Sequence, residues 1–174
     1  MNTKNLVLMA LLVAVGAALY LVIPGYGNGM KPDFMLTMMF IGIFLFPDRR
    51  SVFLLGVTTG VISGIFSSFP GGFLPNVIDK FITAFVIYAA FVTLKNISKH
   101  LIGATVLAGL GTILSGTIFL SIAIFVLGVN LPFFALFLTV VLPAVAMNCI
   151  AFVIIYPIIL GLVKRTNFKT ALSS

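Results

Sequence analysis

Charged residues are scarce in this chain, and acidic residues are the scarcest of all. Of 174 residues, 3 are acidic, 10 are basic and 61% are hydrophobic. A soluble domain carries about a quarter charged residues, so this composition excludes a water-soluble fold. We therefore predict one domain, residues 1–174, that is embedded in a membrane and surrounded by lipid.

Cysteine and histidine are also nearly absent, each with a single copy, Cys149 and His100. A disulfide within the chain is impossible, and one residue of each kind cannot assemble a metal-ligand cluster. His100 has no acid nearby, and the chain contains neither an HExxH motif nor a phosphate-binding loop. We predict no metal, no cofactor, no enzyme activity and no ATP hydrolysis by the chain itself.

Long apolar runs are what the chain does have. They predict six transmembrane helices at 5–23, 34–46, 51–69, 75–94, 101–127 and 132–163, the last interrupted by Pro143 and Pro157. The first run resembles a secretory signal, but further spans follow it, so we interpret it as a permanent helix. The predicted fold class is an all-α membrane protein, a compact bundle of six helices.

The basic residues mark one side of this bundle. Eight of the ten lie at the N-terminus, in every second gap between apolar runs, and at the C-terminus: Lys4, Arg49, Arg50, Lys95, Lys99, Lys164, Arg165 and Lys169. Lys and Arg near span ends are retained in the cytoplasm, so both termini are predicted to be cytoplasmic. Because these charges occupy short gaps and form no basic face, the net charge of +7 does not indicate a nucleic-acid partner.

Asn76, Asp79 and Lys80 mark the outer end of the fourth run, where the charges of Asp79 and Lys80 break this rule. A helix start explains an acid there, because the acid complements the helix dipole, but it leaves Lys80 unexplained. Helical spacing places Asn76 and Lys80 on one face and Asp79 and Thr83 on another, with Asp79 and Lys80 about 100° apart and not facing each other. Ionisable residues at membrane depth are functional candidates, so we predict that these three bind substrate.

Lys31 and Asp33 lie on the same predicted outer side, in the first loop. Each has an ordinary explanation, Asp33 as a helix cap and Lys31 as a solvated charge. Together with Asp79 and Lys80 they supply two cations and two anions, which suits a zwitterion with one carboxylate and one ammonium. Asn148, deep in the last run, must find a partner, either a carbonyl freed near Pro143 or a ligand. We include Lys31, Asp33 and Asn148 among the candidate substrate-binding residues.

Two stripes of small residues recur at every fourth position: Ala10, Ala14 and Ala18 in the first run, and Gly56, Gly60 and Gly64 in the third. Such stripes let helix backbones approach closely in lipid. Internal packing explains either stripe, and docking of a partner membrane protein is the alternative for the alanines. Aromatic residues near the outer side are candidates for the walls of a pocket: Tyr26, Phe66, Phe69, Phe73 and Phe133.

Three stretches carry a family resemblance: GMKPDFMLTMMF at 29–40, FPGGFLPNVIDK at 69–80 and VLPAVAMN at 141–148. They resemble the bacterial tryptophan-transporter (TrpP) family, and the similarity covers nearly the whole chain. That family in turn resembles the substrate-binding S components of energy-coupling factor (ECF) transporters. In S components, six helices bind ligand near the outer face, and a small-residue stripe on the first helix docks a coupling subunit that carries two ATPases.

The resemblance implies a multi-pass protein of the bacterial cell membrane that takes up tryptophan as an ECF S component. It would assign the docking stripe to Ala10, Ala14 and Ala18. The alternatives are an S component for another small nutrient such as a vitamin, and a self-sufficient secondary amino-acid transporter. A membrane scaffold without transport activity is a further alternative of a different class.

Overall fold

The computed structural model describes residues 3–24, 32–94 and 100–166, and within these residues every regular element is helical. The helices are, in order, α1 (Thr3–Val22), α2 (Phe34–Leu45), α3 (Arg49–Ile65), α4 (Phe73–Thr93), α6 (Leu101–Ser121) with the π-helical η1 (Ile122–Val126), and α7 (Phe133–Leu136) with the π-helical η2 (Phe137–Val141) and α8 (Leu142–Arg165). The predicted all-helical architecture is confirmed for these residues.

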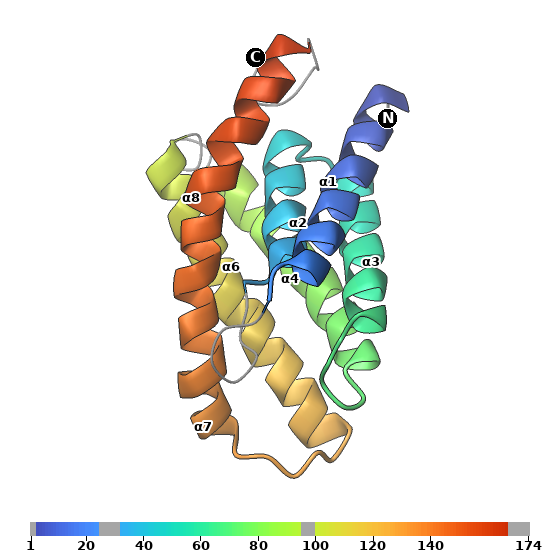
Figure 1. Ribbon diagram of the computed structural model, residues 1–174, viewed down its shortest axis with the longest axis vertical. Helices are drawn as coiled ribbons and strands as arrows, with labels where there is room; N and C mark the ends of the chain where they lie inside the picture. Colours follow the sequence, from blue (N-terminus) through green and yellow to red (C-terminus); the bar gives the residue numbers. More distant parts are fainter. Residues whose placement is uncertain (1–2, 25–31, 95–99, 167–174) are drawn as a thin grey trace.

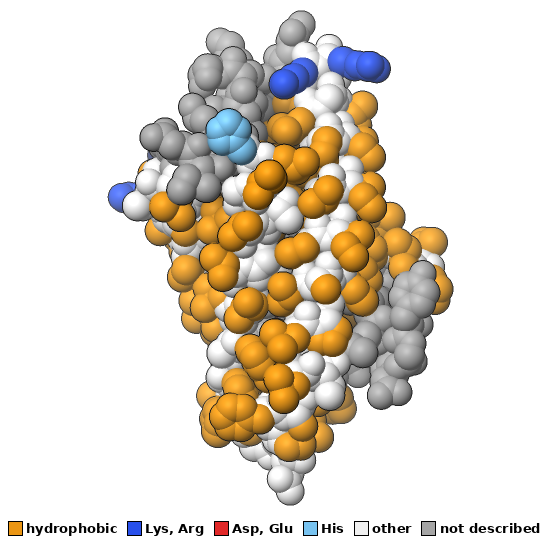
Figure 2. Space-filling model, turned by 90° about the vertical axis from the view of Figure 1, so that its left-hand side faces the viewer, with side chains coloured by type: hydrophobic (Ala, Val, Ile, Leu, Met, Phe, Trp, Pro, Cys, Tyr) orange, Lys and Arg blue, Asp and Glu red, His pale blue; other side chains and the backbone are white. Residues whose placement is uncertain are grey.

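The helices form an elongated bundle in which the start of α1 and the end of α8 lie at the same end (Figure 1). The α2–α3 connection and the start of α6 also lie at this terminal end, whereas the α3–α4 connection and the start of α7 lie at the other. On the face shown in Figure 2, hydrophobic side chains cover most of the surface, and Lys and Arg side chains lie toward one end. This surface is suited to lipid contact along its length.

Four helical segments are long and apolar enough to cross a membrane: Thr3–Val22, Phe73–Thr93, Leu101–Val126 and Phe133–Arg165. Helices α2 and α3 are shorter, with 12 and 17 residues. The structure therefore supports a helical membrane protein, while the count of six spanning helices stays a prediction.

Helix α2 is the central element of the bundle. All 12 of its residues are buried, and Phe40, Ile43, Phe44 and Leu45 are among the most enclosed side chains of the hydrophobic core. Its neighbours are α1, α3, α4, α6 and α8. The α2 sequence is apolar on every side, which is the pattern of a helix surrounded by other helices.

The glycine stripe packs inside the bundle, against α4. A Cβ atom on Gly60 would lie 3.0 Å from the Cα of Val77, and one on Gly64 would lie 3.0 Å from the carbonyl oxygen of Phe73. These distances leave no room for a side chain, so the stripe serves close α3–α4 packing. The alanine stripe differs, because Ala10, Ala14 and Ala18 are all exposed on the outer surface of α1.

The last helical segment corrects one expectation. The helix continues through Pro157, which lies inside α8, so the predicted interruption there is wrong. Near Pro143 the backbone does change, because the π-helical η2 directly precedes α8 and Pro143 sits in the first turn of α8. A proline lacks the N–H that a continuous helix needs, and a π-helical turn is one way to accommodate that loss.

Candidate functional site

A cavity of about 430 Å³ lies in the half of the bundle away from the termini. Its volume falls within the range of small-molecule sites in proteins. Its wall is built from the ends of α1 and α3, the α3–α4 connection, the starts of α2, α4 and α8, the last turns of α6, and α7 with η2. The residues that line it include Tyr20, Asp33, Met35, Ser63, Ser67, Phe69, Asn76, Asp79, Lys80, Thr112, Ser115, Phe119, Val141 and Asn148.

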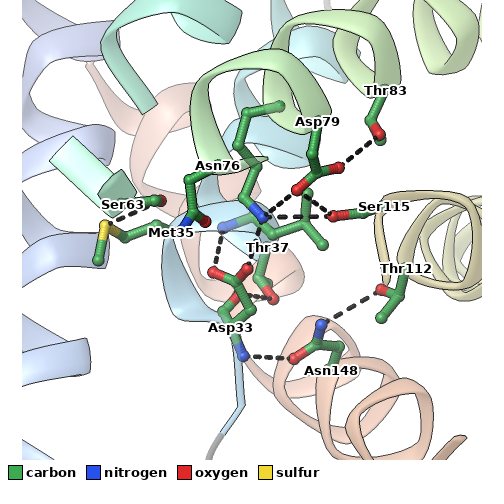
Figure 3. A network of polar contacts seen from close by, with 12 residues as sticks. Asp33, Met35, Thr37, Ser63, Asn76, Asp79, Thr83, Thr112, Ser115 and Asn148 are labelled. Carbon is green, nitrogen blue, oxygen red and sulfur yellow. Dashed lines mark hydrogen bonds and ion pairs between the residues drawn. The ribbon is translucent and has the colours of Figure 1, made fainter. Parts of the chain in front are cut away.

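Lys80 is the centre of a buried polar group, which we call the charged cluster and which consists of Asp33, Asp79, Lys80 and Ser115 (Figure 3). Its Nζ lies 2.9 Å from an oxygen of Asp33, 2.9 Å from an oxygen of Asp79 and 3.2 Å from Ser115 Oγ. An ammonium has three donors, so all three are used within the cluster. The pairing with two carboxylates is what allows a lysine to be buried in this apolar bundle.

Asp79 forms the inner end of the charged cluster. Its Oδ2 accepts hydrogen bonds from Lys80 and Ser115, and its Oδ1 accepts one from Thr83, at 3.0 Å. The side chain is only 1% exposed. The expected Asp79–Thr83 alignment is confirmed, but the expectation that Asp79 and Lys80 do not face each other is wrong. Adjacent residues on a helix point apart, yet the long flexible stem of lysine bends back far enough to reach its neighbour.

Asp33 forms the outer end of the cluster, and its side chain is 31% exposed. One carboxylate oxygen accepts the backbone N–H of Leu36 at 2.9 Å, which makes Asp33 the N-cap of α2, as the sequence indicated. The other oxygen pairs with Lys80. The same residue therefore fixes the start of the central helix and presents the most accessible charge of the cluster.

Asn148 joins α8 to this arrangement. Its Oδ1 accepts the backbone N–H of Asp33 at 2.7 Å, and its Nδ2 donates to Thr112 Oγ1 at 3.2 Å. Among the described residues the hydrogen-bond partners of Asn148 are Asp33 and Thr112, not a carbonyl near Pro143, and a contact with a ligand stays a prediction. Thr112 itself donates to the carbonyl of Ala108, a backbone bond that is common for hydroxyls in membrane helices.

The structure brings together five of the six predicted substrate-binding residues, and all five line one cavity: Asp33, Asn76, Asp79, Lys80 and Asn148. The sixth, Lys31, lies outside the described residues. Ser115 bridges Lys80 and Asp79, and the sequence analysis did not identify it as part of the site. Nothing in the α6 sequence distinguishes Ser115 from the other hydroxyl residues of that helix.

The aromatic wall differs from the predicted set. Of the five candidates Phe69 lines the cavity, and Tyr26 lies outside the described residues. Phe66, Phe73 and Phe133 are absent from the lining. Phe119 packs edge-on against Phe69, with ring centroids 5.3 Å apart, and Tyr20 adds a third ring to the wall. Helix spacing alone does not show which rings turn inward, because that depends on how neighbouring helices cross.

The charged cluster gives one part of the cavity wall a strongly polar character. If all three charged groups are ionised, one ammonium and two carboxylates give a net charge of −1 (+1 − 2) in the cluster. Among the described residues there is no group of His, Cys, Asp and Glu side chains that could hold a metal ion. The cavity thus combines a charged floor with apolar and aromatic walls, the combination that fits an amphipathic small molecule.

The fold and the cavity define a class: multi-pass membrane proteins whose helices enclose a charged, solute-sized cavity. Comparison with known proteins identifies the family. The family described as tryptophan transporter TrpP matches residues 2–164, and the chain belongs to this family. Membership places it among transporters rather than enzymes and agrees with its apolar helices in assigning it to the membrane of a bacterium.

The similar proteins cover nearly the whole chain. A probable tryptophan transport protein of Bacillus subtilis (strain 168) is 47% identical over 171 residues, which cover 98% of this chain and 99% of the relative. A protein with the same description from Clostridium acetobutylicum is 41% identical over 159 residues, 90% of this chain and 91% of the relative. One from Clostridium perfringens (strain 13 / Type A) is 36% identical, with 95% and 96% covered. No solved structure matches the chain.

Proposed function

We propose that this protein binds tryptophan in the cavity from the outer side of the bacterial membrane and delivers it inward. The observation that carries the proposal is the charged cluster in the wall of a cavity that is also lined by aromatic, apolar and neutral polar side chains. Membership of the tryptophan transporter family and the descriptions of the relatives support the choice of amino acid.

The ion pair between Asp33 and Lys80 is the proposed grip for the amino-acid backbone. A zwitterion that enters between them replaces one internal ion pair by two, with its ammonium on Asp33 and its carboxylate on Lys80. Asp33 is the accessible partner, whereas Asp79 stays behind Lys80 and keeps the ammonium in place. Asn148 orients Asp33 through its backbone N–H, and Lys31 remains a second candidate for the substrate carboxylate.

The indole ring would lie against the aromatic part of the wall. Phe69 and Phe119 supply two rings at right angles, with an interplanar angle of 81°. A flat apolar ring can stack on one and meet the edge of the other, which adds to the free energy gained from burial.

For transport, we propose an S component of the ECF type, a single domain with six spanning helices and both termini in the cytoplasm. The basic residues at the terminal end of the bundle, among them Lys4, Arg49 and Arg165, support this orientation. The exposed stripe of Ala10, Ala14 and Ala18 on α1 is available to a coupling subunit, and two ATPases bound to that subunit would supply energy.

The absence of tryptophan from the chain offers a direct binding test. With excitation beyond the absorption of tyrosine, fluorescence comes from added tryptophan alone, and transfer into the apolar cavity should shift its emission to shorter wavelength. Titration of purified protein in detergent should give a saturable shift. The variant Lys80→Met should show none, and absence of a response in the native protein at millimolar tryptophan would refute the assignment.

Two further measurements separate the alternatives. Binding of a vitamin but not of tryptophan would identify an S component for another nutrient. Uptake of labelled tryptophan into vesicles that contain this protein alone would identify a self-sufficient transporter and refute the requirement for a coupling subunit. A scaffold without transport activity would show neither binding nor uptake.

A further inference from the structure

Asn76 has an unused hydrogen-bond acceptor in the cavity. Its Nδ2 donates to the carbonyl oxygen of Gly72 at 2.7 Å, and the residue lines the cavity while being 8% exposed. Because a carbonyl oxygen can only accept, this bond fixes the orientation of the amide and leaves Oδ1 as the free end. No described residue donates a hydrogen bond to this oxygen.

Four other neutral polar side chains of the cavity already have hydrogen-bond partners. Ser63 donates to the sulfur of Met35, and Ser67 accepts the backbone N–H of Phe69. Thr112 and Asn148 bond to each other, and both ends of the Asn148 amide are used. The amide oxygen of Asn76 is therefore a neutral acceptor in the cavity wall to which no described residue donates a hydrogen bond.

The position of this acceptor relative to the charged cluster is also defined. Asn76 and Lys80 are four residues apart on α4, so they lie on one face of the helix with Cβ atoms about 6 Å apart. In the view of Figure 3 the amide of Asn76 lies between the Ser63–Met35 contact and Asp33, which pairs with Lys80. If the charged end of a ligand binds at the charged cluster, the rest of the ligand would therefore lie against the part of the cavity wall that carries Asn76 Oδ1.

We propose that Asn76 is a specificity-determining residue that accepts a hydrogen bond from the ring N–H of the bound amino acid. This inference rests on the proposed tryptophan binding and deepens it. A ligand that fills the cavity displaces water from the Asn76 oxygen, and a ring with an N–H restores the lost hydrogen bond. A ring without that donor leaves a buried acceptor unpaired, and sites built in this way reject such ligands strongly.

The test compares tryptophan with benzothienylalanine, in which sulfur replaces the ring N–H with little change of shape. Dissociation constants are measured by titration calorimetry on the purified full chain. The native protein should bind tryptophan about 10- to 100-fold more tightly. In the Asn76→Leu variant the dissociation constants for the two ligands should become similar, mainly because tryptophan binds more weakly. This variant should still fold, because the carbonyl of Gly72 keeps its backbone bond from residue 76 at 3.1 Å.

Asn148→Leu is the matched control, since it removes an amide from the same cavity whose oxygen is already occupied. It should weaken both ligands and preserve their ratio. Equal binding of the two ligands by the native protein would overturn the inference and leave tryptophan binding intact, even if no variant could be purified. A ratio that persists in Asn76→Leu would also overturn it. Binding of neither ligand to the native protein would instead refute the proposed function, and the inference with it.

Discussion

The two halves of the bundle share helices but differ in what they bury. Toward the terminal end, Phe44 stacks on Phe91 at a centroid distance of 4.7 Å and meets Phe152 and Tyr156 edge-on. In the other half the same three helices, α2, α4 and α8, line the cavity, and the charged cluster lies at the start of α2, on α4 and on α6. On α8, Asn148 and Phe152 are only four positions apart.

The two halves of these helices therefore have different roles, one in stability and the other in the proposed binding of substrate. The aromatic half is densely packed and buries apolar area, which holds the helices together. The other half contains a cavity and an ion-paired lysine, both of which cost stability compared with a filled apolar core. The comparison therefore predicts that substitutions in the aromatic half change stability alone, whereas those in the cavity half change binding as well.

The largest effect is expected from Lys80→Met. It leaves the carboxylate of Asp79 buried beside Ser115 without its countercharge, and removing one partner of a buried ion pair costs about 3–5 kcal/mol. Binding should be abolished and the thermal transition in detergent should fall steeply. The double variant Asp79→Asn with Lys80→Met should recover stability without binding, and a single variant as stable as the native protein would contradict the buried pairing.

Phe44→Ala should cost a similar amount of stability without an effect on the ligand. The ring is fully buried, and truncation of such a residue to alanine destabilises by about 3–5 kcal/mol. The dissociation constant of the protein that remains folded should be unchanged. A marked change in affinity at low temperature, where the variant is folded, would show that the two halves are coupled.

Asp33→Asn should have the opposite signature, a loss of binding with little loss of stability. Asparagine caps a helix as well as aspartate does, and Lys80 keeps Asp79 as a countercharge. Loss of the charged contact to the substrate ammonium should weaken binding about 10- to 100-fold. Asp48→Asn is the control, because Asp48 caps α3 through Arg50 and Ser51 outside the cavity lining and should leave affinity unchanged.

Tyr156→Phe should produce the smallest change and a stabilising one. The hydroxyl of Tyr156 is buried in the aromatic half and has no hydrogen-bond partner among the described residues. Removing an unpaired polar group should raise stability by about 1 kcal/mol. The thermal transition should rise slightly at unchanged affinity, and a lower transition would indicate that the hydroxyl has a partner such as a buried water.

Sequence reasoning located the chemistry of the site better than its geometry. Asp79 and Lys80 were evident because charge inside an apolar run contrasts with everything around it. The contacts of Asn148 with Asp33 and of Lys80 with Ser115 join residues 115 and 35 positions apart. Such contacts depend on how separate helices pack against each other, and the residue pattern along a single helix does not predict that packing.

The helices themselves were predicted closely, since long apolar runs allow few other structures in lipid. The errors came from local rules that packing overrides. Proline was expected to interrupt the last helix at Pro157, but α8 runs through it, as membrane helices often do when their neighbours support the backbone. Likewise, the glycine stripe and the alanine stripe look equivalent in sequence, and only the structure shows that one faces inward and the other outward.

The enclosure of α2 has a consequence for how the protein meets bilayers of different thickness. At 12 residues α2 is only about 18 Å long, far less than a hydrocarbon core of about 30 Å. Because its side chains touch protein on all sides, no acyl chain must compress to match it, and hydrophobic mismatch acts on the surrounding ring of helices alone. In thinner or thicker membranes we therefore expect the outer helices to change their tilt. Helix α2, with Asp33 as its N-cap, should keep its length and its position at the cavity.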